Sequence, residues 1–300
     1  MGVKAALETI IRHQMDFLVG NERASVHLKG DAAHALRRKK ELLKERNAEI
    51  IKCDARVSVI RELAVGQRKD VDYVVHFQYF IRQKDFFYVE EEQVYRCALF
   101  ERGRLEGDRY AAYETMDEAG ETLEREVTKG KGKGSPIPYK YDRLEAVKYA
   151  EAWWNGRNPA YRNFQDNCTN FISQCLHAGG SPMSGYPNVG RGWWQQNQQW
   201  SWSWSVAHSF QWYLTGAAIG LRAQQVEKPE ELLLGDVIAY DFENDGRWNH
   251  TTIVTAKDAN GMPLVNAHSA DSRRRYWAYQ DSSKYTPQMK YKFFHILDNV

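Results

Sequence analysis

All ten tryptophans of this 300-residue chain lie in its second half, beginning at Trp153. The first 140 residues hold 26 Lys and Arg and 24 Asp and Glu, whereas the last 160 hold 15 of each kind. Between them, residues 127–138 read VTKGKGKGSPIP, a mixture of glycine, lysine, serine and proline that lacks the apolar area to order itself. The sequence therefore predicts two domains, residues 1–126 and 139–300, joined by a linker over residues 127–138.

Composition excludes several classes of protein. With 43% hydrophobic and 27% charged residues, the chain is of ordinary globular type, and its net charge of +2 gives no electrostatic case for nucleic acid as a partner. No apolar run is long enough to span a bilayer, and Glu8, Arg12 and Asp16 interrupt what would be the core of a secretory signal. We therefore expect a cytoplasmic protein, unless it is exported by a non-classical route or a leader is missing. The oligomeric state stays open.

The first domain is predicted to be α+β, with helices and an antiparallel sheet. Leu7 to Leu18 show helical spacing, and Asp31 is a plausible N-cap for a second, highly charged helix that continues through Ile50. The basic run from Arg37 to Lys40 is followed by acidic residues within helical reach, which favours a solvated helix face. Strands separated by short polar junctions are expected at Ala55–Val65, Val71–Gln83, Phe86–Phe100 and Leu105–Tyr113. His76 lies in one of them as an isolated, structural histidine, so this domain shows no chemical constellation and its role stays unknown.

The second domain carries a candidate nucleophile. After a predicted helix over Tyr141–Trp154, the segment FQDNCTNFISQCLHAGG predicts another helix that closes at Gly179–Gly180 and places Cys168 in its first turn. The amides and macrodipole of a helix N-terminus lower the pKa of a thiol, and a thiolate is the nucleophile of cysteine hydrolases. Cys175, two turns further along, is expected to be buried filler.

Two histidines are candidates for the base. Strands are expected at Val237–Tyr240, His250–Thr255 and Leu264–Ala267, so that His250 begins one strand and His268 follows its neighbour. An antiparallel pair brings such residues close, and one could act as base toward Cys168 while the other orients it. A zinc site of Cys168, His250 and His268 is the alternative, but the sequence lacks paired ligand spacing and a fourth ligand. We expect no metal and no cofactor.

The motifs DNCTNFISQ, GDVIAYDF, NHTTIV and NAHSADS, in this order over Tyr141 to Ile296, resemble the putative amidase domain family of Gram-positive bacteria. That family belongs with the papain-like superfamily of NlpC/P60 and CHAP cell-wall hydrolases. The resemblance implies a papain-like domain in which the cysteine helix packs on an antiparallel sheet, with Cys168 as nucleophile and His250 as base. His268, or alternatively Asp271, would be the third residue. The family has an acid directly before the cysteine, whereas here Asn167 follows Asp166.

Substrate contacts are assigned to Asp166 and to tryptophans of the connection between these motifs, where residues 193–220 carry no Asp, Glu, Lys or Arg. Ser205 is expected to cap a helix through Val206, Phe210 and Leu214. Flat indoles next to amides suit sugars or an extended peptide, although large aromatics also cap cores. The tryptophans assigned to the substrate are Trp193, Trp194 and Trp248.

The sequence thus predicts a cysteine-dependent amidase or peptidase that acts through an acyl-enzyme. Bacterial peptidoglycan or a similar peptide is the substrate class that the resemblance implies. Two alternatives remain open: a glycan- or peptide-binding module with an idle dyad, and a thiol acyltransferase.

Overall fold

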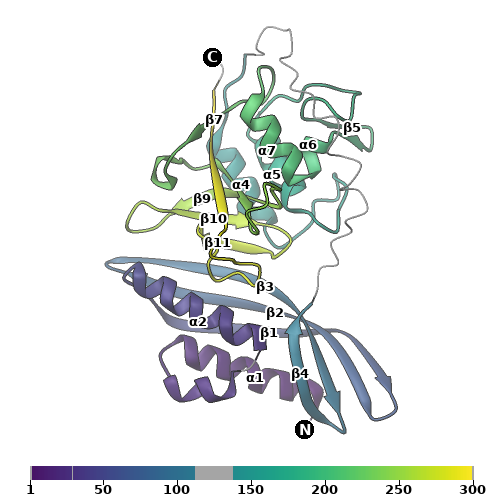
Figure 1. Cartoon of the computed structure of the whole chain (residues 1–300), viewed down its shortest axis with the longest axis vertical. Helices are drawn as coiled ribbons and strands as arrows, with labels where there is room; N and C mark the ends of the chain where they lie inside the picture. The colour runs from purple at the N-terminus through teal and green to yellow at the C-terminus, as the bar shows by residue number, and fades with distance from the viewer. Residues whose placement is uncertain (1, 29, 112–137, 299–300) are drawn as a thin grey trace. The chain divides into compact units, whose positions relative to one another are not determined.

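The computed structural model describes residues 2–28, 30–111 and 138–298 of the chain (Figure 1). Two compact units are present: Met1–Ala112 with Ala270–Tyr285, and Tyr113–Ser269 with Thr286–Val300. Both combine helices with antiparallel strands, so the predicted α+β class is confirmed. Of the predicted linker, residues 127–137 lie outside the described residues.

Four long antiparallel strands form the sheet of the first unit. Each hairpin turns through two residues, and Arg102 and Gly103 both have positive φ (50° and 74°), the backbone of a turn whose twist matches the strands it joins. Four strands with short junctions are confirmed, but the first begins at Ala48 and not at the predicted Ala55, and the predicted end of the fourth at Tyr113 lies outside the described residues. The strands are β1 (Ala48–Val65), β2 (Arg68–Gln83), β3 (Phe86–Glu101) and β4 (Arg104–Tyr110).

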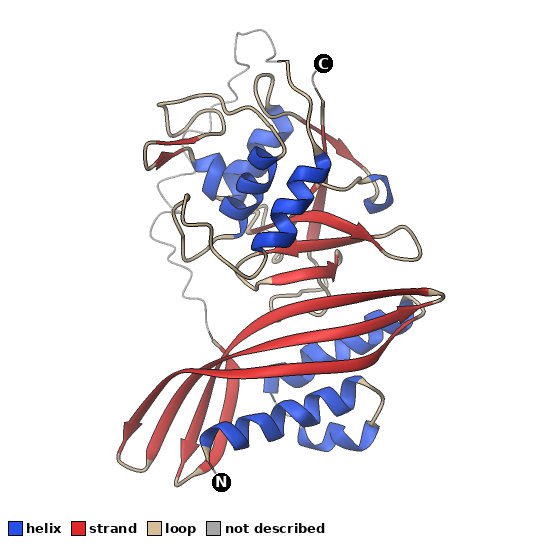
Figure 2. Cartoon of the chain, turned by 180° about the vertical axis from the view of Figure 1, so that it is seen from behind, coloured by secondary structure: helices blue, strands red, loops and turns tan. Residues whose placement is uncertain are grey.

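The helices of the first unit are α1 (Val3–Leu18) and α2 (Gly30–Glu45), joined through the short 3-10 helix η1 (Glu22–His27). Both α-helices lie on the same face of the sheet (Figure 2). Two details of the second predicted helix are wrong. It begins before Asp31, which therefore lies in the first turn, and it ends at Glu45 because Asn47 adopts a left-handed conformation (φ 53°) that terminates a helix.

The first unit also includes a late segment of the chain, Ala270–Tyr285. Its strand β11 (Ser272–Tyr276) pairs with β3. A buried ionic cluster fastens the same segment to α2, because the ammonium of Lys39 contacts Glu90 and lies 2.9 Å from Asp281. Burial alone would lower the pKa of Lys39, but the charges of Asp281 and Glu90 raise it. The expected solvated helix face is therefore wrong at Lys39, because nothing local in the sequence predicts this long-range ionic contact.

We expect Lys39→Met to destabilise the first unit by about 3–5 kcal/mol, because it leaves the buried Glu90 without its cation and leaves Asp281 with Arg275 alone. Hydrogen exchange at peptides of β2, β3 and residues 270–285 measures the loss. Lys40→Met is the matched control: Lys40 pairs with the exposed Glu22, and such pairs contribute about 1 kcal/mol or less. Equal protection in the two variants would contradict this account of the cluster.

The second unit has a sheet in the order β10-β9-β8-β12-β7, with antiparallel pairing throughout. The three strands predicted around the histidines are confirmed, whereas the two others lacked a clear signal in the sequence. The five strands are β7 (Ala223–Val226), β8 (Val237–Asp241), β9 (His250–Lys257), β10 (Pro263–Ala267) and β12 (Lys290–Ile296).

Helix α5 (Cys168–Ala178) packs on this sheet and carries nearly all of its length in the core. The other helices are α4 (Arg143–Trp153), α6 (Trp202–Ser205), α7 (Ala207–Gly216) and the 3-10 helix η3 (Pro229–Glu231). The short strands β5 (Gln195–Gln196) and β6 (Gln199–Trp200) form a separate hairpin. Ser205 does not cap α7 as predicted: it ends α6, and Val206 is the N-cap. Within the described ranges, no helix combines the length and apolar character needed to cross a bilayer.

Candidate active site

Cys168 is the first residue of α5, as the sequence predicts, and only 2% of it is exposed. The first hydrogen bond of the helix runs from the Phe171 N–H to the Asn167 carbonyl, at 3.0 Å. The backbone amides of Cys168, Thr169 and Asn170 therefore precede the helical ladder and point toward the helix start. This is the arrangement in which a helix presents amide donors to a negative charge.

The sulfur of Cys168 is held against strand β9. Hydrogen bonds from both the backbone and the hydroxyl of Thr251 reach it, and the Thr169 hydroxyl lies 3.7 Å away. The Thr169 and Thr251 hydroxyls are themselves 3.2 Å apart. Because Thr251 follows His250 directly, these contacts join the helix start that carries Cys168 to the strand start that carries His250.

The electrostatics of Cys168 differ from the expectation. Burial, with a smaller contribution from the negative charge of Asp166, raises the pKa of the thiol to about 12, although the hydrogen bonds from Thr169 and Thr251 lower it. The prediction of a lowered pKa is therefore wrong for the net balance, because burial is the largest influence on this thiol. At neutral pH the group is a thiol, and its use as a nucleophile requires a base.

His250 is the first residue of β9, as predicted, and is 7% exposed. It pairs with Tyr240 of β8, and its ring lies beside the rings of Tyr240 and Phe242, with centroids 5.5 Å and 5.9 Å apart. His250 is thus next in the chain to Thr251, the residue that meets Cys168, but neighbouring strand residues project from opposite faces, and the imidazole packs against Tyr240 and Phe242. Proton transfer between Cys168 and His250 stays a prediction.

His268 follows β10 and reaches the residue before the nucleophile. Its Nδ1 accepts a hydrogen bond from the Asn167 amide at 2.7 Å, its Nε2 donates to the Trp153 carbonyl at 2.8 Å, and its ring stacks on Phe171 with centroids 3.9 Å apart. Burial, with a smaller contribution from the charge of Arg157, lowers the pKa of His268 to about 3. The ring is therefore neutral, and these contacts tie it to the start of α5. Its predicted role toward His250 stays a prediction.

Ser269 completes the attachment. Its hydroxyl accepts from the Asn167 N–H at 3.0 Å and donates to the Asp166 carboxylate at 2.7 Å. We call His268, Ser269 and Asn167 the helix-start clamp. Sequence reasoning missed Ser269 and the part played by Asn167; the pattern N-A-H-S after a strand was the available signal. Asp166, two residues before Cys168, is exposed to solvent.

Asp271, the alternative third residue, belongs to the first unit, where its carbonyl accepts a hydrogen bond from the Gln93 N–H at 2.7 Å. The backbone of Asp271 therefore helps to hold the start of β11 against β3. The role of Asp271 as third residue stays a prediction.

The tryptophans assigned to the substrate occupy different environments. Trp193 and Trp194 are 0% and 1% exposed, and their indole N–H groups donate to the Ser173 hydroxyl and to the carbonyls of Asn188 and Arg191. Both side chains lie in the core, so they fit the alternative in which large aromatics cap the core. Trp248 is 9% exposed and lies two residues before His250.

A metal site has little support from the residues present. Within the described ranges, no three His, Cys, Asp or Glu side chains gather in a way that could hold an ion.

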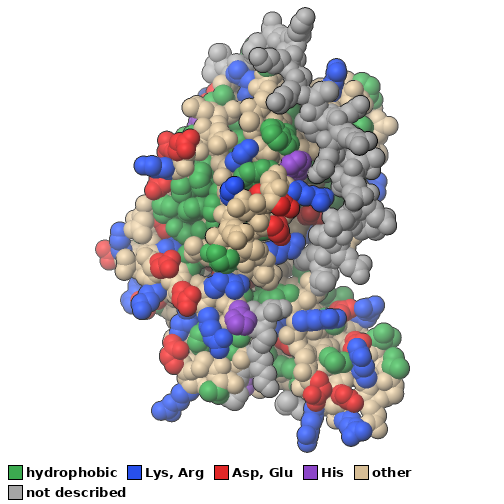
Figure 3. Space-filling model, in the orientation of Figure 1, with side chains coloured by type: hydrophobic (Ala, Val, Ile, Leu, Met, Phe, Trp, Pro, Cys, Tyr) green, Lys and Arg blue, Asp and Glu red, His purple; other side chains and the backbone are tan. Residues whose placement is uncertain are grey.

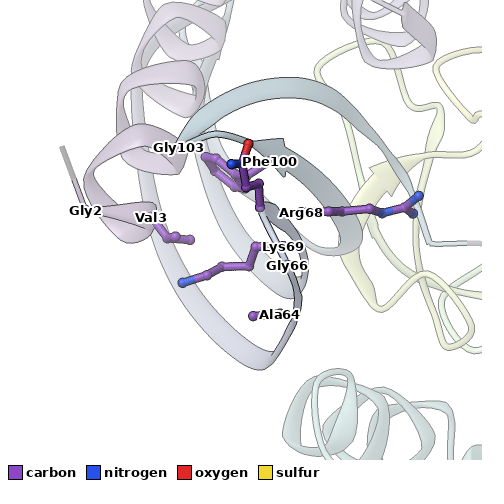
Figure 4. A pocket seen from close by; sticks show the side chains of 9 residues that line it. Gly2, Val3, Ala64, Gly66, Arg68, Lys69, Phe100 and Gly103 are labelled. Carbon is purple, nitrogen blue, oxygen red and sulfur yellow. The ribbon is translucent and has the colours of Figure 1, made fainter.

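On the face drawn in Figure 3, basic and acidic side chains are interspersed. A hollow of about 290 Å³ in the first unit lies between the strand ends, at Gly66, Lys69, Phe100 and Gly103 (Figure 4). Its lining contains neither cysteine nor histidine, and we assign it no chemistry.

Comparison with known proteins gives the family. A model described as "Putative amidase domain" matches residues 140–294. The chain is similar to "Uncharacterized protein YhbB" of Bacillus subtilis (strain 168), with 45% identity over 305 aligned positions covering 100% of this chain and 98% of that protein. "Uncharacterized protein YjcM" of the same organism is 33% identical over 140 residues, covering 44% of this chain and 31% of that protein. No solved structure matches significantly. The chain belongs to the putative amidase domain family, which suggests an amide hydrolase.

The neutral state of His268 leads to a prediction about acid stability. Its pKa is about 3 when folded and near 6.5 when unfolded, so stability is fully present above pH 6.5 and is lost as pH falls toward 3. The expected loss is about 1.4 kcal/mol per pH unit within that window. Urea unfolding followed by tryptophan fluorescence measures it, because nine of the ten tryptophans belong to the second unit.

His268→Gln is the informative variant, because an amide can still accept from Asn167 and donate to Trp153 but does not take up a proton in this range. Between pH 6.5 and 3, the free energy of unfolding of the variant should fall less steeply, by the slope that one proton contributes. All other groups contribute equally to the two proteins. Identical curves would show that His268 does not titrate in this way.

Proposed function

We propose that this protein is a cysteine-dependent amide hydrolase in which Cys168 is the nucleophile and His250 the base. The observation that carries the proposal is the contact of the Cys168 sulfur with Thr251, the residue next to His250. Thr169 and Thr251 lie 82 positions apart in the sequence, and their contact brings together the helix start with Cys168 and the strand start with His250. Membership in an amidase family supports the reaction class.

The raised pKa of Cys168 determines how the first step would run. Because the sulfur is protonated at neutral pH, attack on the amide carbonyl requires that its proton passes to His250 as the C–S bond forms. The tetrahedral intermediate then collapses, the C–N bond breaks, and the imidazolium of His250 gives its proton to the departing amine. The product is a thioester on Cys168.

Water completes the cycle. His250, again neutral, takes a proton from a water molecule that attacks the thioester; the C–S bond then breaks, a carboxylic acid leaves, and the imidazolium returns its proton to the sulfur of Cys168. In both steps the carbonyl oxygen becomes negative. The Cys168 amide, which precedes the helical ladder of α5, is the proposed donor to that oxygen.

For His268 we propose a positioning role. It fixes the Asn167 side chain, and Ser269 fixes the Asn167 N–H, so that the residue before the nucleophile is held by two hydrogen bonds. Loss of such a group disturbs the geometry of attack without removing the base, so His268→Ala should retain measurable activity.

The proposed substrate is a peptide-type amide such as those of bacterial peptidoglycan, in a papain-like domain related to the NlpC/P60 hydrolases. The similarity to Bacillus proteins and the motif resemblance support this class. Asp166, exposed next to Cys168, is the proposed polar contact for a substrate N–H group.

Substitution of the nucleophile gives a test that needs no knowledge of the natural substrate. With p-nitrophenyl acetate as acyl donor, the native chain should release one equivalent of nitrophenol in a burst and carry the acetyl group on the Cys168 peptide. Cys168→Ala should abolish the burst. Cys175→Ala is the matched control, since Cys175 lies on the same helix and is equally buried; it should keep the burst and cost about 1 kcal/mol of stability.

An acetyl group found on Cys175, or a burst that survives Cys168→Ala, would show that the wrong cysteine was chosen. Absence of a burst in the native chain, together with no turnover of any peptide amide, would favour the binding module, and transfer of the acetyl group to an added amine in preference to water would favour an acyltransferase.

Removal of the base should slow acylation by about 10²–10⁴-fold, because the Cys168 proton then has no acceptor. We expect this for His250→Ala, measured as the burst rate, while His177→Ala in the last turn of α5 leaves the rate unchanged. The double variant Cys168→Ala/His250→Ala should be no worse than either single variant, because the two act as a unit. An unaltered burst in His250→Ala would refute the assignment.

A further inference from the structure

The second unit contains a lysine sandwiched by tryptophans that the proposed reaction does not use. The ammonium of Lys292, on β12, lies 4.9 Å from the ring centroid of Trp248 and 5.5 Å from that of Trp212 on α7. Attraction between an ammonium and indole faces holds such a cation in place. Trp212 is 44% exposed, so the cluster reaches solvent.

His208 ties the two tryptophans together. Its ring nitrogens lie 3.1 Å from the indole nitrogen of Trp212 and 3.2 Å from the backbone nitrogen of Trp248. Three separate parts of the chain, α7, the approach to β9 and β12, therefore converge on one ammonium. The ammonium of Lys292 is therefore held by two indole rings that His208 fixes in turn. A lysine on an open surface lacks such contacts.

The charge of Lys292 is not compensated within the part of the chain that the structure describes. Its ammonium has no carboxylate partner among those residues, and burial lowers its pKa. Indole faces attract the cation but supply no anionic oxygen for its N–H donors. A carboxylate is the group that complements a partly desolvated ammonium most strongly.

Strand register relates this ammonium to the nucleophile. Lys292 pairs with Ala239 of β8, and Ala239 pairs with Thr251 of β9, whose backbone and hydroxyl contact the Cys168 sulfur. Directly paired residues project from the same face, and two strand spacings amount to about 10 Å. This distance corresponds to about three residues of an extended peptide.

We propose that Lys292, Trp212 and Trp248 form a subsite for a substrate carboxylate that lies about 10 Å from the carbonyl attacked by Cys168. The proposal rests on the function proposed above and narrows it to amides whose acyl side carries an acidic group. The tryptophan faces hold the ammonium, and the apolar part of the substrate lies along them. The competing explanation is that the lysine stem only covers the indoles.

A binding test separates these explanations without any catalysis. Suberate, a flexible dicarboxylate, is titrated into the Cys168→Ala chain and followed by tryptophan fluorescence. The proposal predicts a saturable response that Lys292→Met, added to Cys168→Ala, weakens by about tenfold, a loss typical of a hydrogen bond to a charged group. Lys292→Arg should keep most of the affinity.

Lys290→Met is the matched control, because Lys290 lies on the same face of the same strand but is exposed, and it should leave suberate binding unchanged. A response that does not saturate, or one that Lys290→Met weakens as much as Lys292→Met, overturns the subsite.

A kinetic test connects the subsite to the nucleophile. The mono-p-nitrophenyl ester of suberate should acylate Cys168 about tenfold faster than its methylated, neutral counterpart, and Lys292→Met should remove that advantage while leaving the neutral ester unchanged. If the proposed function is wrong, neither ester acylates Cys168 in any variant, and suberate binding alone decides on the subsite. Equal rates for the two esters, with normal acylation of Cys168, would overturn the subsite and leave the hydrolase standing.

Discussion

The hydrogen bond from the Asn167 amide to His268, at 2.7 Å, is the contact on which the candidate active site depends. Asn167 is the N-cap of α5, yet its side chain does not cap the helix. Its carboxamide oxygen instead accepts from the Phe164 N–H and from Asn170, while its nitrogen donates to the imidazole. A single side chain thus joins the loop before α5, the helix itself and the end of β10, and Cys168 is the next residue.

This contact continues into a buried polar network. Asn170 accepts from the indole N–H of Trp204, and Ser173 donates to the Trp204 carbonyl while accepting from the indole of Trp193. All of these groups are buried, and each hydrogen bond inside a low-dielectric core is costly to lose. The tryptophans therefore serve two purposes at once: their rings fill the core, and their N–H groups satisfy polar side chains of the helix that carries the nucleophile.

Local patterns in the sequence predict those elements whose ends are marked by turn residues. The hairpin turns of the first unit and the strands around His250 and His268 are bounded by such residues, and their predicted limits agree with the structure within a few positions, whereas β1 begins seven residues before the predicted Ala55. The end of α2 was missed because the left-handed Asn47 terminates the helix at Glu45, so that Ile50, expected in the helix, belongs to β1. β11 and β12 were missed because their partners are distant in sequence, at β3 and β8.

The candidate site shows the same division. Residue types and order predicted the positions of Cys168 at a helix start and His250 at a strand start, because capping and strand signals are local. The net pKa of Cys168 and the partners of His268 depend on burial and on contacts across more than 100 positions, such as His268 with Asn167. No pattern within a single segment contains that information.

The central claim is that His250 activates a thiol which burial keeps protonated. Its most direct test is the rate of iodoacetamide alkylation of Cys168 relative to Cys175, read by mass spectrometry of peptides from the native chain near neutral pH. Burial raises the pKa of both thiols, so an unassisted Cys168 would react as slowly as Cys175. The account predicts faster alkylation of Cys168 and a fall to the Cys175 rate in His250→Ala. Equal, slow alkylation of both cysteines in the native chain would contradict it.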